Sequence, residues 1–129
     1  MVSRGGVTYV VVEESLTWLE SVGKCRLLGG DLAVIDNHQD FELMREMLLE
    51  LHASGQNRGW AMWVDGTDSL TSDVWYCVSR QSNCPYIFWS SSVTAASDKH
   101  CACVRADRSY AGGMAECTCA DSYYPLCEF

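Results

Sequence analysis

The C-terminal stretch AECTCADSYYPLCEF, residues 115–129, decides the fold class of this chain. It contains Cys117 and Cys119, whose C-x-C spacing repeats that of Cys101 and Cys103, and it ends with Cys127. The chain holds eight cysteines in 129 residues. An even and dense set of cysteines is typical of a disulfide framework, which persists in oxidising compartments. We therefore expect an extracellular domain, either secreted or part of the ectodomain of a membrane protein. Spacing alone leaves the pairing of the cysteines open.

The charge balance excludes two classes of partner. The chain has 17 acidic and 9 basic residues and a formal net charge of -8. It therefore has no basic surface that could neutralise phosphates, so we expect no binding of nucleic acid or of anionic membranes. The apolar run at residues 7–12 is far shorter than the roughly 20 residues of a membrane span, and it predicts a strand. We expect one domain at residues 7–129, with no membrane insertion, after a disordered or vector-derived end at residues 1–6.

Helix signals occupy the first half of the chain. Ser15 or Thr17 can cap a first helix, and Glu20 follows Thr17 at the spacing of a capping box. Gly29 and Gly30 predict its end, because glycine enters the left-handed conformation cheaply. A second helix is predicted from residue 37, where apolar residues recur every three or four positions. After residue 59, short aromatic and β-branched runs between turn residues predict strands and long loops.

Three groups of residues resemble those of one known family. Trp18 and Cys25 precede the run LGGDLA at residues 28–33, and the run WVDGTD follows at residues 63–68. The spacings that join Trp89 to Cys103 and Met114 to Cys119 and Cys127 complete the pattern. From about residue 9 to residue 129 the chain resembles the C-type lectin-like domain, although Asp65 stands where that family usually has a glycine. The resemblance implies an α+β fold of two helices flanking small antiparallel sheets, with a long loop region and disulfide staples.

The resemblance also implies a disulfide pairing. In the family pattern, Cys25 pairs with Cys127 and Cys103 pairs with Cys119. Cys77 and Cys84 flank a polar turn, so we expect a bridge across a hairpin. The remaining two cysteines, Cys101 and Cys117, are then expected to pair with each other.

Lectins of this family bind calcium through oxygen ligands, and the matching positions of this chain lack most of them. Cys101 stands where a ligating Glu is expected, and the Trp-Asn-Asp triplet is replaced by Met114, Ala115 and Glu116. The positions of the Glu-Pro-Asn triplet hold Val93, Thr94 and Ala95. Only Glu116 keeps a carboxylate. We therefore expect no metal and no cofactor, and a disulfide between Cys101 and Cys117 beside the vacated calcium site.

Other kinds of site fit the sequence less well. The C-x-C pairs with His100 could hold zinc, but structural zinc sites usually use C-x-x-C knuckles. No G-x-S-x-G turn or activated nucleophile is visible, so we do not expect an enzyme. The tryptophans at positions 60, 63, 75 and 89 could form a sugar-stacking surface, yet in this fold we expect most of them in the core.

The function predicted from the sequence is recognition of a protein or glycan ligand through loops, without the usual calcium site. The candidate ligand-binding residues are Asp98, Lys99, His100, Tyr110 and Glu116. The sequence is also compatible with a homo-oligomer. Two alternatives stay open: a calcium-dependent carbohydrate-binding lectin with displaced ligands, and a structural spacer in a larger extracellular protein.

Overall fold

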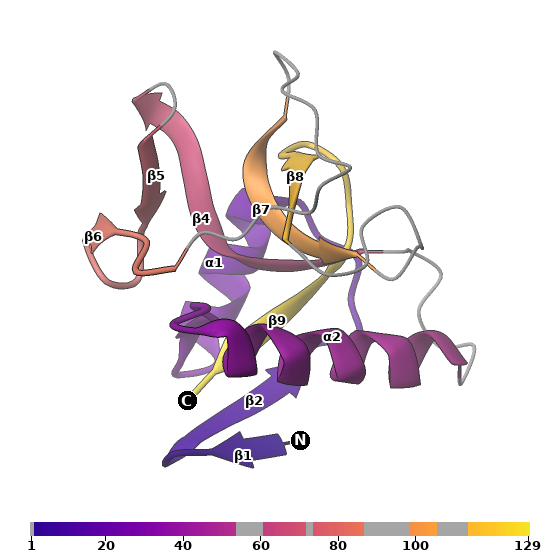
Figure 1. Ribbon diagram of the computed structural model, residues 1–129. Helices are drawn as coiled ribbons and strands as arrows, with labels where there is room; N and C mark the ends of the chain where they lie inside the picture. Colours follow the sequence, from indigo (N-terminus) through magenta and orange to yellow (C-terminus); the bar gives the residue numbers. More distant parts are fainter. Residues whose placement is uncertain (1, 54–60, 72–73, 87–98, 106–113) are drawn as a thin grey trace.

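The computed structural model describes residues 2–53, 61–71, 74–86, 99–105 and 114–129. Within these residues the protein has two helices, α1 (Trp18–Leu27) and α2 (His38–Ala53) (Figure 1). The strands are β1 (Val2–Arg4), β2 (Val7–Val11), β3 (Asp31–Leu32), β4 (Ala61–Thr71), β5 (Val74–Cys77), β6 (Ser82–Asn83), β7 (Lys99–Arg105), β8 (Ala115–Thr118) and β9 (Tyr124–Glu128). The predicted α+β class, with two helices and mainly antiparallel strands, is confirmed.

The long strand β4 is the branch point of the sheet. One path runs in the order β1-β2-β9-β4-β5-β6, while β7 pairs with β4 and carries β8 on its other edge. Only the pairing of β4 with β9 is parallel among the described strands. The two termini lie together at the end of the molecule formed by β1, β2 and β9, and β7 and β8 lie at the opposite end (Figure 1).

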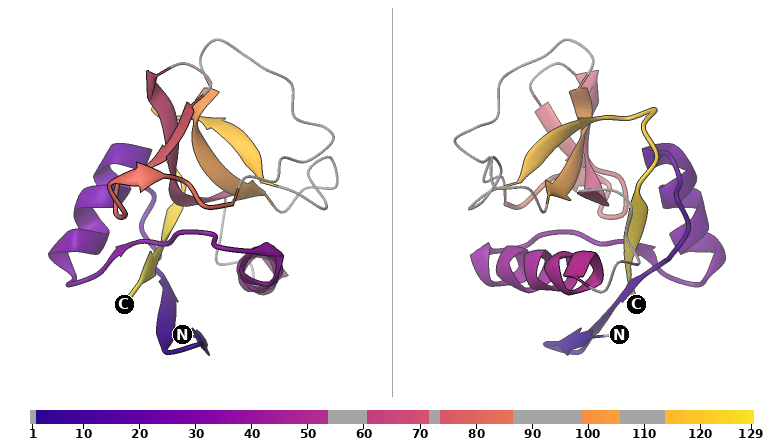
Figure 2. Two further views of the ribbon diagram at one scale, coloured as in Figure 1. Left: turned by 60° about the vertical axis from the view of Figure 1, so that its left-hand side comes forward. Right: turned by 90° about the vertical axis from the view of Figure 1, so that its right-hand side faces the viewer.

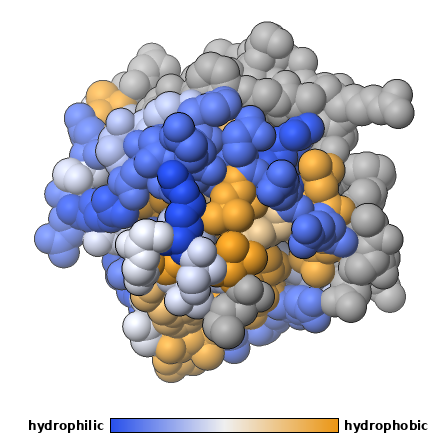
Figure 3. All heavy atoms as spheres, turned by 60° about the horizontal axis from the view of Figure 1, so that its bottom comes forward, coloured by the Kyte–Doolittle hydropathy of each residue, from blue (hydrophilic) through white to orange (hydrophobic). Residues whose placement is uncertain are grey.

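The N-terminal residues form a hairpin. The strand predicted at residues 7–12 is β2, and β1 pairs with it, with Val2 opposite Tyr9. The sequence predicted a disordered or vector-derived end at residues 1–6, whereas residues 2–4 form a strand; the domain boundary at residue 7 stays a prediction. Seen from this end, the molecule exposes apolar patches among polar ones (Figure 3). A groove of about 310 Å³ between the hairpin and α2 is lined by Val2, Val10, Val11, Glu13, Met47, Glu50 and Leu51.

Both faces of β4 are covered, so the protein has two adjoining cores. Alternate residues of a strand point to opposite faces. Met62 and Val64 belong to a core that includes Phe41, Met44 and Leu48 of α2. The other face belongs to a second core, which contains Ala61 and Trp63 of β4 and Trp18, Val22 and Cys25 of α1. The two helices accordingly lie on opposite sides of β9, next to β4 (Figure 2).

Two tryptophans fasten α1 to β4. The indole Nε1 of Trp18 donates to the carbonyl of Val64 at 3.0 Å, and that of Trp63 donates to the carbonyl of Leu16 at 2.8 Å. Each buried N–H therefore finds an acceptor on the other segment, which removes the cost of burying an unpaired donor. The prediction of a core position is confirmed for Trp63, which is fully buried.

Of the other tryptophans predicted for the core, Trp75 is half-buried and packs against the core that contains the apolar residues of α2. Trp60 and Trp89 lie outside the described residues.

The ends of α1 follow local signals. Thr17 caps the helix: its hydroxyl accepts from the N–H of Glu20 at 3.3 Å, and the Glu20 carboxylate accepts from the N–H of Thr17 at 3.0 Å. Gly29 has a φ of +96°, as predicted for a helix end. Gly30 is required for a different reason, because a Cβ at this position would lie 2.3 Å from the carbonyl oxygen of Glu128.

Asp65 explains one departure from the family pattern. Its side chain is buried in β4, and its carboxylate accepts from the N–H of Val78 at 3.0 Å and from the N–H and hydroxyl of Ser79 at 2.9 and 2.6 Å. Burial raises the pKa of the Asp65 carboxyl above its usual value, although these hydrogen bonds oppose the shift. Asp65 thereby holds the turn that the disulfide between Cys77 and Cys84 closes.

Two predicted disulfides are confirmed. Cys25 of α1 is bonded to Cys127 of β9 across 102 residues, and Cys77 is bonded to Cys84 across seven. The first closes a loop that spans most of the chain, worth about 4 to 5 kcal/mol in the chain-entropy model.

Glu128 gives the fold a pH dependence that can be tested. Its carboxylate accepts from the N–H of Val34 at 2.6 Å, and burial raises the pKa of the Glu128 carboxyl above its ordinary value of 4.5, although that bond and Arg80 oppose the shift. The folded state therefore holds this proton more tightly than the unfolded chain. The stability that it contributes is fully present below pH 4.5 and is lost as the pH rises through the raised pKa.

We expect Glu128→Gln to keep the acceptor for Val34 and to remove this titration. The free energy of unfolding of the native protein minus that of the variant should then fall as the pH rises from about 4.5 towards neutral. Urea unfolding of both proteins between about pH 4 and 8 measures this difference. A difference that rises with pH would contradict the expectation.

Candidate ligand-binding site

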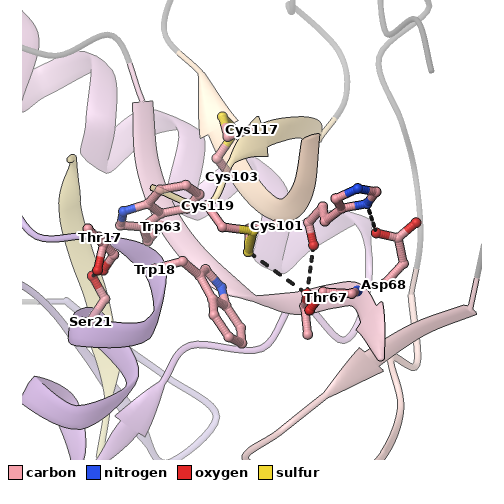
Figure 4. Close-up of a disulfide and its surroundings, with 12 residues drawn as sticks. Thr17, Trp18, Ser21, Trp63, Thr67, Asp68, Cys101, Cys103, Cys117 and Cys119 are labelled. Carbon is pink, nitrogen blue, oxygen red and sulfur yellow. Dashed lines mark hydrogen bonds and ion pairs between the residues drawn. A yellow bond between two sulfur atoms is a disulfide. The ribbon is translucent and has the colours of Figure 1, made fainter. Parts of the chain in front are cut away.

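Four cysteines lie on the neighbouring strands β7 and β8. In the ladder, Cys101 stands opposite Cys117 and Cys103 stands opposite Ala115. Residues two apart on a strand share a face, so Cys101 and Cys103 face the same core as Trp18 and Trp63. The view in Figure 4 shows the two cysteines of β7 close to these tryptophans.

The disulfides on this ladder differ from the predicted pairs. Cys101 is bonded to Cys119, with Cα atoms 5.2 Å apart, and Cys103 is bonded to Cys117, at 6.0 Å. The predicted pairs Cys103–Cys119 and Cys101–Cys117 are wrong. The register excludes one of them: Cys119 lies four residues beyond the residue opposite Cys103, about 13 Å along the strand, which exceeds the reach of a disulfide. Cys103 is bonded to Cys117 instead, which leaves Cys119 as the partner of Cys101.

The position of Cys101 bears on calcium. Cys101 is 1 % exposed and belongs to the core that contains the apolar residues of α1. Its sulfur lies 3.9 Å from the hydroxyl of Thr67. A disulfide sulfur there offers no hard oxygen donor for Ca²⁺. All eight cysteines are in disulfides, so none supplies a thiolate for the zinc site considered from the sequence. The positions at residues 93–95 lie outside the described residues.

The structure places three of the predicted ligand-binding residues on the neighbouring strands β7 and β8. Lys99 and His100 begin β7, and Lys99 stands opposite Thr118. Glu116, half-buried in β8, stands opposite Ala102, about 10 Å along the ladder from Lys99. Asp98 and Tyr110 lie outside the described residues. The role of all five residues in binding stays a prediction.

His100 belongs to a polar cluster that the sequence did not reveal. Its Nδ1 lies 2.8 Å from the carboxylate of Asp68 (Figure 4), and its backbone carbonyl accepts from the hydroxyl of Thr67 at 2.7 Å. The hydroxyl of Ser69 bonds to that of Thr67 at 2.8 Å. The side chain of Asp68 is 11 % exposed and that of His100 is 40 % exposed, so the carboxylate fixes the orientation of a ring that solvent still reaches.

A pocket of about 440 Å³ opens beside this cluster. It lies where the start of α1 meets the ends of β4, β7 and β8, and the N–H of Trp18 bonds to the carbonyl of Cys119 at this junction. The lining residues are Trp18, Leu19, Ser69, His100, Cys101, Thr118, Cys119 and Ala120. Only His100 among them was a candidate from the sequence.

The chain matches the model of the lectin C-type domain over residues 14–129. It belongs to the C-type lectin domain family. No curated protein matches the sequence. Among the residues that the structure describes, neither helix of this C-type lectin domain is long and apolar enough to cross a membrane.

Solved structures of the same fold include a carbohydrate-recognition domain and antifreeze proteins. The domain is similar to the carbohydrate-recognition domain of the mouse scavenger receptor C-type lectin, with 18 % identity, a TM-score of 0.77, and coverage of 99 % of this chain and 91 % of that one. It is also similar to herring type II antifreeze protein, with 16 % identity, a TM-score of 0.78, and coverage of 98 % of this chain and 93 % of that one. A calcium-independent type II antifreeze protein has 16 % identity and a TM-score of 0.77, with coverage of 99 % of this chain and 89 % of that one. At these identities the likeness shows the fold.

Disulfide mapping tests the corrected pairing. We expect peptides from the non-reduced protein to link Cys101 with Cys119 and Cys103 with Cys117. The double variant Cys101→Ala/Cys119→Ala should fold with no free thiol and lose about 3 kcal/mol of stability. The double variant Cys101→Ala/Cys117→Ala should instead expose two thiols to a maleimide reagent. The reverse pattern of thiol labelling would show that the pairing is wrong.

The hydroxyl of Thr67 is expected to hold the cluster in place. Thr67 is 2 % exposed, and besides its bond to His100 it accepts from the N–H of Ser69 at 3.2 Å. Thr67→Val leaves both of these backbone groups without this partner, which should cost about 1 to 3 kcal/mol in urea unfolding. Thr71→Val, at the exposed end of the same strand, is the matched control and should change stability by less than about 0.5 kcal/mol. Equal effects of the two substitutions would rule out this role.

Proposed function

We propose that this C-type lectin domain is an extracellular recognition module that binds a protein or glycan ligand without the usual calcium site. The ligand surface would be at the end of the molecule where β7 and β8 lie, with Asp98, Lys99, His100, Tyr110 and Glu116 as contact residues. Domains of this family bind glycans or proteins, and four disulfides in one chain suit an oxidising extracellular compartment.

One observation carries the calcium-free part of the proposal. Cys101, at the position where the family resemblance implies a ligating Glu, is buried and bonded to Cys119. For calcium to have an oxygen ligand at this position, a side chain from elsewhere would have to reach into the core between α1 and β4. With Val93, Thr94 and Ala95 at the triplet positions, the chain offers Glu116 as the one matching carboxylate, and a single carboxylate is far from the six to eight oxygen ligands that Ca²⁺ takes.

The charges at this end of the molecule support a role in recognition rather than in spacing alone. Lys99 starts β7 beside the pair of His100 and Asp68, and these groups offer both donors and acceptors. The excess of acidic residues, with a net charge of -8, favours a neutral or cationic ligand surface. A pure spacer would have no need for these groups.

Calcium titration tests the proposal at the level of the metal. An ion that binds only the folded form raises the melting temperature, by the linkage between binding and folding. We expect millimolar calcium to leave the melting temperature unchanged relative to EGTA. A rise of several degrees would favour the alternative of a calcium-dependent lectin with displaced ligands.

Cell-binding and glycan-array screens, run with calcium and with EGTA, test recognition itself. We expect binding that EGTA does not reduce and that Lys99→Glu weakens several-fold, because the substitution removes the N–H donors that Lys99 offers to acceptor groups of the ligand. Arg26→Glu is the matched control, since Arg26 is exposed on α1 and pairs with Asp31 away from β7. Absence of binding in every screen would favour the spacer, and equal loss in both variants would remove Lys99 from the site.

A further inference from the structure

The pocket beside His100 has the size and the lining of a small-molecule site. Its volume of about 440 Å³ lies within the range of roughly 300 to 1,000 Å³ that ligand pockets occupy. Such pockets are mainly apolar and contain a few polar groups that orient the ligand. We propose that this pocket binds a small, uncharged aromatic molecule that carries a hydroxyl group, that is, a phenol. The pocket is separate from the loop recognition proposed above, although His100 borders both.

The apolar walls favour a flat aromatic body. Trp18 and Leu19 come from the first turn of α1, and Ala120 follows the strand β8. The disulfide between Cys101 and Cys119 forms part of the same wall. Aromatic rings gain from offset contacts with other rings and from contacts with sulfur, beyond the area they bury. A polyhydroxylated sugar would place several hydroxyl groups against walls that offer no hydrogen bonds.

The rim of the pocket supports the same conclusion. Leu19 is 74 % exposed, although α1 carries buried residues on the face next to β4. Its side chain borders the pocket and would lose water contact when a ligand enters. This burial gives an apolar ligand a source of affinity that the free protein does not use.

The polar residues of the lining gather at one rung of the sheet. Ser69 lies two residues beyond Thr67, which stands opposite Cys101, and Thr118 stands opposite Lys99. Ser69 and Thr118 therefore stand on either side of Lys99 at one level of the sheet, and the next residue of β7, His100, also lines the pocket. The Thr67 hydroxyl donates to the carbonyl of His100, so the Ser69 hydroxyl donates to Thr67 and keeps its oxygen free to accept from a phenol, while the Thr118 hydroxyl is of a kind that both donates and accepts.

Charge disfavours an anionic ligand. The carboxylate of Asp68 lies 2.8 Å from Nδ1 of His100, a lining residue, and the chain has a net charge of -8. A carboxylate that enters between the apolar walls would lose its hydration. It would also be repelled by the carboxylate of Asp68 and by the net negative charge of the domain. A neutral hydroxyl avoids both costs.

Binding of p-cresol and toluene tests this inference, because the two molecules differ only by the hydroxyl group. In calorimetric or NMR titrations we expect p-cresol to bind about tenfold more tightly than toluene, the factor that one net hydrogen bond supplies. The amide signals of Leu19, Ser69 and Thr118 should shift on addition of p-cresol. Thr118→Val, which removes a hydroxyl at nearly constant volume, should narrow the preference for p-cresol over toluene.

Two variants of α1 locate the site. Leu19→Glu places a charge on the rim and should weaken p-cresol binding by about tenfold or more. Leu27→Glu is the matched control, because Leu27 is 80 % exposed on the same helix and lies outside the pocket lining; it should leave binding unchanged. Both variants change exposed residues, so circular dichroism and melting should match those of the native domain.

Several results would overturn the inference. Equal affinity for p-cresol and toluene would show that the polar rung does not select a hydroxyl. No binding of p-cresol, or binding that Leu19→Glu leaves intact, would show that the pocket is not a phenol site. These outcomes are independent of the cell-binding and calcium experiments, which concern the loop surface.

Discussion

The arrangement of this domain depends on the exchange of hydrogen bonds between Trp18 and Trp63. The indole N–H of Trp18 bonds to a carbonyl of β4, and that of Trp63 bonds to a carbonyl just before α1. Neither ring can move away without leaving its N–H without a hydrogen-bond acceptor. The exchange sets the start of α1 against β4. Because β7 pairs with β4, it also sets the distance between α1 and the cysteine ladder. The pocket at that junction exists because these three elements are held together.

Local features of the fold could be predicted because local sequence determines them. The capping box of Thr17 and Glu20, the left-handed turn at Gly29 and the apolar spacing of α2 each depend on residues within a few positions. The need for a glycine at position 30 could not be predicted, because it arises from a carbonyl 98 residues further along the chain. The buried carboxylate of Asp65 is similar, since its partners belong to a turn that only the folded sheet brings near.

The ladder and the site show the same limit. All eight cysteines were predicted to be bonded, but the partners on β7 and β8 depend on the register of the two strands, which the spacing of the cysteines does not reveal. Of the pocket lining, only His100 was predicted as a ligand-binding residue. Asp68 lies 32 residues from His100, and Leu19 reads as an ordinary exposed residue of a helix. Their common location follows from the packing of α1 on the sheet, which no spacing within the sequence expresses.

The position of the chain ends has a practical consequence. N- and C-termini emerge side by side from the hairpin and β9, while β7, β8 and the pocket lie at the far end (Figure 1). A biotin acceptor or an affinity tag attached to either terminus would therefore immobilise the domain on a sensor surface with its ladder pointing outward. The same geometry allows two copies to be joined in tandem through a short linker without covering either ladder.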